Sequence, residues 1–93
     1  MRFVFEYDPP KAASNLARHG VSFTEAMTVF DDPLASTLPD DQHSEDEERW
    51  ISVGMSSRHR ILFVVYTEAV SGTRLIGART ATAAEIRQYE EGS

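Results

Sequence analysis

The spacing of apolar residues predicts a strand followed by a helix at the start of the chain. Residues 2–7, RFVFEY, have the alternating period of a β-strand. Asp8 is a preferred N-cap residue, and Pro9 and Pro10 fit only in the first turn of a helix. Gly20 can adopt a positive φ and so end a helix. We therefore predict a helix from Pro9 to His19.

A second helix is predicted immediately afterwards, up to about Phe30. Ser22 and Glu25 have the spacing of a capping box, in which side chain and backbone at each end satisfy one another. Apolar residues then recur at helical spacing on one face: Phe23, Ala26, Met27 and Phe30. Asp31, Asp32 and Pro33 end this pattern.

The remainder of the chain changes to strand signals. A short strand at residues 34–37 is followed by three predicted strands, at 49–55, 60–67 and 73–80. The apolar run of residues 60–67 indicates a central strand that is covered on both faces. The last predicted element is a helix at 82–91, which begins with a second capping box made by Thr82 and Glu85. Helices kept apart from a strand meander predict an α+β fold.

Length and composition predict one domain, residues 1–93, in the cytoplasm. The chain of 93 residues has 41% hydrophobic residues, enough for one modest core. The absence of cysteine excludes disulfides and thiolate metal sites. No run of about 18 apolar residues and no secretion signal is found, so we expect no membrane association.

The net charge argues against nucleic-acid binding, but the distribution of charge along the chain weakens this argument. The net charge is −6, whereas phosphate binding depends on Lys and Arg. Residues 31–48, however, contain eight acidic residues and no Lys or Arg, and outside this segment nine basic residues stand against seven acidic ones. A local basic patch is therefore compatible with the sequence. The acidic segment is either a solvated loop or a docking surface for a basic partner.

Two residues have both a structural and a chemical interpretation. His19 falls in the last turn of the first helix, where a cation complements the helix dipole, but it also suits acid–base chemistry near neutral pH. Arg79 follows a short apolar run, where an arginine either forms an ion pair or holds an anion. Its candidate partners are Glu85 and the acids before Arg49. Spacing alone does not separate these interpretations.

Other classes of site have weak support. His19, His43 and His59 are never paired at a spacing typical of metal ligands, so no metal is expected. A nucleophile elbow and a glycine-rich phosphate loop are both missing. We therefore predict no cofactor, and a metal hydrolase would have to show activity that is sensitive to chelators.

The order of short motifs resembles the BrnT family of type II toxins. The resemblance runs from Phe5 to about Glu90. It is carried by FEYDPPK, Asn15, RHGVSF, EA..VF.DP, Glu48 and Arg49, Gly54, VVYTE, R.IGAR.AT and E.R.YE. The resemblance implies a RelE-like fold, with an antiparallel sheet of three to five strands, two N-terminal helices and one C-terminal helix. It also implies an endoribonuclease toxin that arrests growth and is neutralised by a BrnA antitoxin, whose DNA-binding part represses the shared operon.

The polar motif positions of the family fall on eight residues: Asp8, Lys11, Asn15, His19, Arg49, Arg79, Glu85 and Tyr89. Metal-free RNA cleavage needs proton transfer and cations for the charge that develops on phosphorus. We therefore predict His19, Arg49 and Arg79 as catalytic residues. Lys11 and Tyr89 are predicted to bind substrate, and the other three to be caps or pairing partners.

Some positions depart from the family pattern. Tyr7 stands where Trp is usual, Gly77 where Ser is common, and Thr80 and Ile86 where basic residues are frequent. These departures, with the acidic balance, support an alternative in which the chain is a catalytically degenerate binding module. Such a module would assemble with the antitoxin and modulate operon repression.

Overall fold

The fold is α+β, as predicted. The computed structural model describes residues 4–42 and 47–92. Its elements are β1 (Phe5–Glu6), α1 (Pro9–His19), α2 (Phe23–Met27), the 3₁₀ helix η1 (Thr28–Asp31), β2 (Ser36–Pro39), β3 (Trp50–Met55), β4 (Ile61–Ala69), β5 (Gly72–Thr80) and α3 (Ala83–Glu91).

The five strands form one mixed sheet in the order β1-β5-β4-β3-β2. The strands from β2 to β5 make an antiparallel meander, and β4 occupies the predicted central position. The prediction of an antiparallel sheet is wrong only for β1, which pairs in parallel with β5 through Phe5 and Thr73. These two segments lie near opposite ends of the chain, so no local pattern indicates the direction of their pairing.

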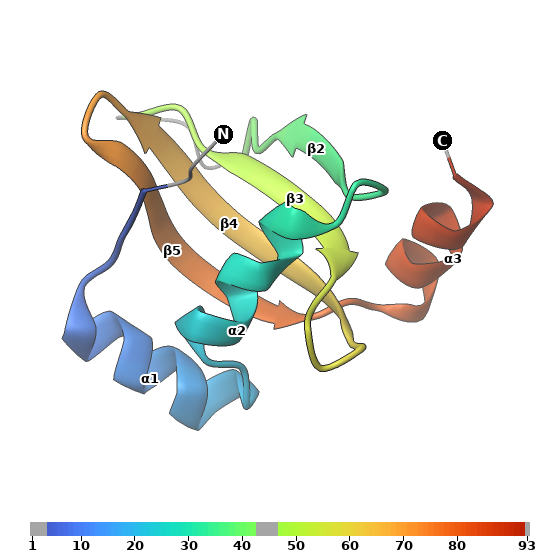
Figure 1. Cartoon of the computed structure of the whole chain (residues 1–93), viewed down its shortest axis with the longest axis horizontal. Coiled ribbons are helices and arrows are strands. Elements are labelled where there is room, and N and C mark those ends of the chain that lie inside the picture. Colours follow the sequence, from blue (N-terminus) through green and yellow to red (C-terminus); the bar gives the residue numbers. More distant parts are fainter. Residues whose placement is uncertain (1–3, 43–46, 93) are drawn as a thin grey trace.

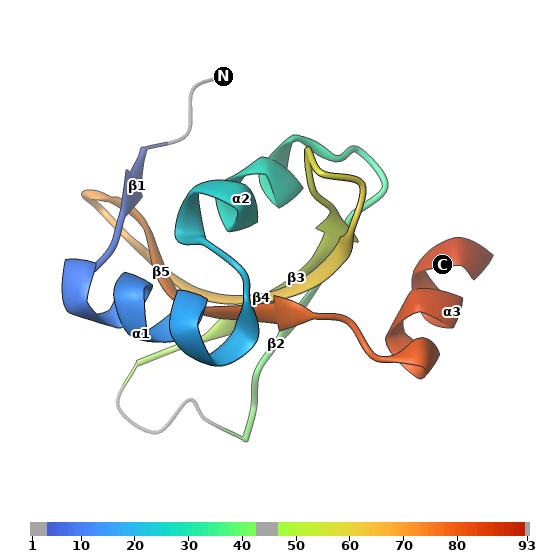
Figure 2. The same ribbon diagram turned by 90° about the horizontal axis from the view of Figure 1, so that it is seen from below.

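The helices occupy three different places around the sheet (Figures 1 and 2). Helix α2 and η1 lie across one face, α1 lies beside β5 at an edge, and α3 stands apart beyond the end of β5. The core lies between the covered face and α2 with its flanking residues. It is made of Val21, Phe23, Ala26, Val29, Leu62, Val64, Tyr66, Leu75 and Ala78. The face opposite to this core is called the open face below.

Helix α1 has the predicted bounds because the signals at both ends are local. Gly20 adopts a left-handed conformation with φ 69°, and its N–H donates to the carbonyl of Leu16. At the other end Asp8 occupies the N-cap position, but its side chain accepts no capping hydrogen bond. Pro10 lacks one of the N–H groups that such a cap normally engages.

The second predicted helix is α-helical over fewer residues than expected. Regular α-helix ends at Met27, and the chain continues as η1 to Asp31. The hydroxyl of Ser22 accepts from the N–H of Glu25 at 3.0 Å. The carboxylate of Glu25 does not return to Ser22, because it is bound by Ser56 and Arg60. Only half of this predicted capping box forms, whereas the box of Thr82 and Glu85 is complete.

A β-bulge sets which side chains of β5 face the core. Val65 of β4 lies opposite Gly77, but Tyr66 lies opposite Leu75, so Ile76 has no opposite residue. Leu75 consequently packs in the core, while Arg79 lies opposite Phe63 on the open face. Phe63 and Val65 are only half-buried. The prediction that β4 is covered on both faces is therefore wrong.

Candidate functional site

Asn15 attaches α1 to the edge of β5. Its side-chain amide donates to the carbonyls of Val21 and Ala78, both at 2.9 Å, and its oxygen accepts from the N–H of Ala78 at 3.1 Å. Asn15 is 8% exposed. The sequence assigned it a structural role, and these contacts confirm that role. They fix the position of the polar side chains that α1 presents beside the sheet.

A shallow basic pocket lies between α1 and β5. It has a volume of about 260 Å³ and is lined by Lys11, Ser14, Asn15, Arg18, His19 and Ile76. Lys11 and His19 are exposed. Arg18 and His19 occupy the last turn of α1, where cations complement the helix dipole. Two predicted site residues, Lys11 and His19, are thus brought to one pocket.

A second pocket lies on the open face of the sheet. Its volume is about 460 Å³, and its lining residues are Asp40, Gln42, Arg49, Ile51, Phe63, Val65, Ile76, Gly77 and Arg79. The two predicted arginines, Arg49 and Arg79, share this pocket. Because Ile76 lines both pockets, the pocket of α1 and the pocket of the open face adjoin one another.

Arg79 is held on two sides. Its Nη1 and Nη2 donate to the two carboxylate oxygens of Glu85, at 2.9 and 3.0 Å. Its Cζ lies 3.8 Å from the centre of the Phe63 ring, in a cation–π contact. The hydrogen bond from Arg79 holds the pKa of Glu85 below its usual range, although partial burial opposes this shift. The ion pair with Glu85 that the sequence allowed for Arg79 is therefore present.

Three other strand-region arginines are also engaged by glutamates. Arg60 binds the buried carboxylate of Glu25 through Nε at 2.9 Å and through Nη2 at 2.5 Å. Arg58 approaches the same carboxylate at 3.9 Å. Arg74 contacts both oxygens of Glu47, at 2.9 and 3.0 Å. These contacts tie segments of the chain together.

Tyr89 lies apart from the two basic pockets. Its hydroxyl donates to Oδ2 of Asp32 at 2.5 Å, and this bond raises the pKa of Tyr89 to about 12. Tyr89 lines neither the pocket of α1 nor the pocket of the open face. The structure therefore does not bring it together with Arg49 and Arg79, and its observed contact joins α3 to the end of η1.

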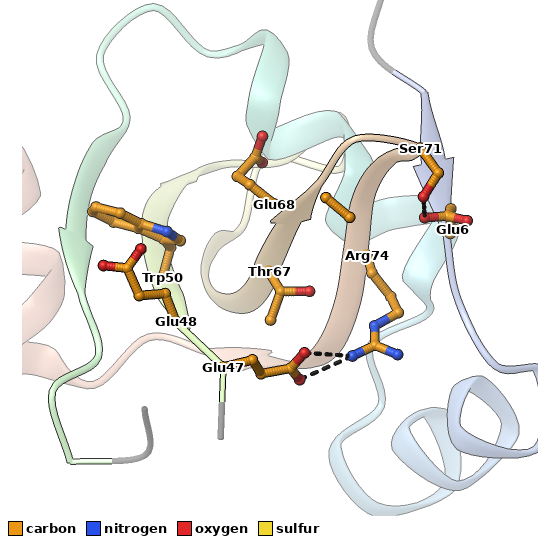
Figure 3. A pocket seen from close by; sticks show the side chains of 9 residues that line it. Glu6, Glu47, Glu48, Trp50, Thr67, Glu68, Ser71 and Arg74 are labelled. Carbon is orange, nitrogen blue, oxygen red and sulfur yellow. Dashed lines mark hydrogen bonds and ion pairs between the residues drawn. The ribbon is translucent and has the colours of Figure 1, made fainter. Parts of the chain in front are cut away.

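An acidic cleft of about 620 Å³ opens near the turn between β4 and β5 (Figure 3). Four glutamates line it together with Trp50 and Arg74: Glu6, Glu47, Glu48 and Glu68. Glu47 points toward Arg74, and Glu6 accepts from the hydroxyl of Ser71 at 2.8 Å. This balance of charge repels phosphate groups. Anionic ligands are therefore better suited to the pockets that contain Lys11, Arg49 and Arg79.

Within residues 4–42 and 47–92, no three His, Asp or Glu side chains gather as a metal site would require. His43 lies outside the described residues. Over the same described ranges, no helix combines the length and the apolar character needed to span a membrane.

Sequence reasoning missed two residues of the open face. Phe63 belongs to an apolar run that reads as core, and its contact with Arg79 depends on the pairing of β4 with β5. Ile76 joins the two pockets because the bulge leaves it without an opposite residue. Strand register is a long-range property, so neither role has a local signal.

Comparison with known proteins identifies a matching family and a solved structure of similar fold. Residues 7–85 match the family described as ribonuclease toxin, BrnT, of type II toxin-antitoxin system. The 1.1 Å crystal structure of the Brucella abortus ribonuclease toxin BrnT has a similar fold, with a TM-score of 0.65 and 23% sequence identity. The similarity covers 84% of this chain and 95% of that chain. Among curated proteins no match was found.

Proposed function

Because the chain belongs to the BrnT family of ribonuclease toxins from type II toxin–antitoxin systems, we propose that it is a metal-independent endoribonuclease that cleaves cellular RNA. The toxin acts in the cytoplasm, where it inhibits translation and arrests growth. A BrnA-like antitoxin neutralises it by direct binding. Contact with operator DNA is indirect, through the antitoxin.

The observation that carries this proposal is the shared pocket of Arg49 and Arg79. Two guanidinium groups line one pocket of the open face, and the adjoining pocket adds Lys11 and His19. Arginine binds phosphate through paired hydrogen bonds, and lysine supplies a compact positive charge. Such an arrangement suits the backbone of RNA, despite the net charge of −6 on the whole chain.

The proposed chemistry needs no metal. A base removes the proton of a ribose 2′-OH, the oxygen attacks the adjacent phosphorus, and the bond from phosphorus to the 5′-oxygen breaks. The leaving oxygen receives a proton, and the product carries a cyclic phosphate. We assign proton transfer to His19, stabilisation of the charge on phosphorus to Arg49 and Arg79, and a phosphate contact to Lys11. Tyr89 is assigned to anchoring α3, since its hydroxyl is engaged by Asp32.

Induction of the chain without its partner tests the proposal. Growth and total RNA integrity are followed for the wild type and for His19→Ala, Arg49→Ala and Arg79→Ala. We expect growth arrest with RNA decay in the wild type, and a loss of cleavage by about 10²-fold or more for Arg79→Ala. Arg87→Ala, which removes an exposed arginine of α3, serves as the matched control and should remain toxic.

Three results would contradict parts of the proposal. Normal growth with intact RNA, from a protein shown to be folded, would favour the binding module that only assembles with the antitoxin. Full toxicity of a folded His19→Ala variant would return His19 to its role as a cation at the end of α1. Purified toxin that loses activity with a chelator would contradict the metal-independent mechanism.

A further inference from the structure

The hydrogen-bond donors of Arg79 are only partly used by the protein. A guanidinium has five N–H groups. Nη1 uses both of its own, toward Glu85 and toward the carbonyl of Thr80 at 3.1 Å, and Nη2 uses one toward Glu85. In the part of the chain that the structure describes, the N–H of Nε and the second N–H of Nη2 have no hydrogen-bond partner. These two groups lie side by side on one edge of the guanidinium.

The protein therefore holds the guanidinium by its end and by one face. The two carboxylate oxygens of Glu85 accept hydrogen bonds from Nη1 and Nη2 at the end of the guanidinium. Phe63 supports the face, because the pairing of β4 with β5 places its ring beneath the Cζ of Arg79. Glu85 is itself fixed at the start of α3, where one of its oxygens accepts from the N–H of Thr82 at 2.8 Å. Arg79 is thus oriented from two separate elements.

A side chain that is already oriented binds an anion at lower entropic cost. Fixing a mobile, rotamer-rich side chain during binding weakens affinity by roughly three- to tenfold. The edge formed by Nε and Nη2 matches the spacing of two phosphate oxygens, which is the geometry of a bidentate contact. Arg79 lines the pocket of the open face, which is the proposed RNA site.

We propose that Glu85 and Phe63 are positioning residues that hold Arg79 so that its Nε and Nη2 edge receives an RNA phosphate. The ion pair with Glu85 and the binding of phosphate are then compatible, because they use different edges of one guanidinium. This inference rests on the proposed function of the pocket. It assigns to Glu85 an orienting role beyond the capping of α3.

The test is a titration with a 2′-O-methyl RNA trinucleotide, which cannot be cleaved through its 2′ position. Binding is monitored by the NMR resonances of the arginine Nε–H groups. In the wild type we expect the Nε–H resonance of Arg79 to shift on titration. Glu85→Asp keeps the charge but withdraws the carboxylate by one methylene, and Phe63→Leu removes the ring without changing charge. Each should weaken binding by roughly three- to tenfold and increase the mobility of the Arg79 side chain. Glu85→Gln, which keeps the reach of the side chain, should recover part of the loss.

Thr82→Ala is the matched control. It removes the hydroxyl that caps α3 but leaves the carboxylate of Glu85 in place, so affinity should stay within about twofold of the wild type. Thermal unfolding of every variant checks that it is folded.

Three outcomes separate this inference from the proposed function. If the trinucleotide binds but the Nε–H resonance of Arg79 does not shift, the positioning role is wrong while RNA binding stands. If Glu85→Asp and Phe63→Leu bind as tightly as the wild type, the positioning role is likewise wrong. If the trinucleotide does not bind the folded wild type at all, the proposed RNA site is wrong and the inference falls with it.

Discussion

At the scale of single residues, Asn15 takes the place of a neighbouring strand along part of β5. Strand β1 pairs with β5 only at Thr73 and Arg74, so the edge of β5 beyond this point needs other partners. The amide of Asn15 satisfies both backbone groups of Ala78 and the carbonyl of Val21. A side-chain amide carries two N–H donors and a carbonyl acceptor, so one side chain can serve all three backbone groups.

Replacement of Asn15 by Ala should therefore be costly. The change leaves three buried backbone groups without their partners, and we expect the free energy of unfolding to fall by about 2–4 kcal/mol. Urea denaturation measures this loss. Ser14→Ala, an exposed neighbour on the same helix, should change the free energy of unfolding by less than about 0.5 kcal/mol. Equal effects of the two substitutions would contradict the role given to Asn15.

At the scale of elements, α3 is attached to the molecule mainly through side chains near its two ends. It contains no buried residue among those that the structure describes. Glu85 binds Arg79 near its start, and Tyr89 binds Asp32 near its end. An element with so little apolar burial opens locally more readily than the sheet. The attachment of α3 is therefore sensitive to single polar groups.

Tyr89→Phe should loosen α3 while leaving the sheet intact. The substitution removes one hydrogen bond to a charged group, and we expect hydrogen-exchange protection of α3 amides to fall by about tenfold. Tyr7→Phe, which changes an exposed tyrosine packed on Phe23, should leave α3 unaffected. Unchanged protection of α3 in Tyr89→Phe would show that its attachment depends on other contacts.

The same contact predicts a response to alkaline pH. The pKa of Tyr89 is raised from 10.0 to about 12, first by its hydrogen bond to Asp32 and then by burial. Its stabilising contribution is thus complete below pH 10 and is lost as the pH rises through about 12. Asp32→Asn should return the pKa of Tyr89 toward 10, as measured by ultraviolet titration of the phenol.

Predictability differed sharply between the elements. The bounds of α1 and the complete capping box of α3 follow from residues that are close in sequence, so both could be predicted. The parallel pairing of β1 and the partner of Glu25 could not, because each depends on residues distant in the chain. Glu85 was among the predicted partners of Arg79, since only six positions separate them.

At the scale of the whole molecule, three carboxylates join separate secondary-structure elements. Glu25 joins α2 to Ser56 and Arg60 around the turn between β3 and β4. Asp32 joins η1 to Met55 and to α3, and Glu85 joins α3 to β5. Each has a lowered pKa. For Glu25 and Glu85 the main cause is the hydrogen bond from an arginine, whereas for Asp32 burial opposes the shift and is outweighed by hydrogen bonds.

These shifts predict that acid destabilises the fold. A carboxylate with a lowered pKa stabilises the folded state above its ordinary pKa, and this contribution is lost as the pH falls through the lowered value. Unfolding in urea at a series of pH values should show stability declining below about pH 4.5, the ordinary pKa of Glu25 and Glu85. Glu25→Gln should lower stability near neutral pH by about 2–4 kcal/mol and make the acid decline shallower.

The exposed Glu90→Gln of α3 is the matched control for Glu25→Gln and should change neither quantity. If stability declines with acid equally steeply in Glu25→Gln and in the wild type, the importance of the buried Glu25 carboxylate and its contact with Arg60 is contradicted.

The candidate site could be predicted as a set of residue types but not as an arrangement. The family motifs indicated Lys11, His19, Arg49 and Arg79, and the structure places these four in two adjoining pockets. Tyr89 belongs to the same motif set but contacts Asp32 instead. Its direction depends on how α3 leaves the end of β5, and no spacing along the sequence encodes that path.

The bulge at Ile76 reverses the alternation of side chains along β5. In a regular strand, residues four positions apart point to the same side, yet Leu75 points to the core and Arg79 to the open face. One extra residue reverses the count between them. Without this residue, Leu75 and Arg79 would point to the same side of the sheet. Either Arg79 would then face the core or Leu75 would face solvent. A single extra residue thus decides that Leu75 packs in the core while Arg79 lies on the open face.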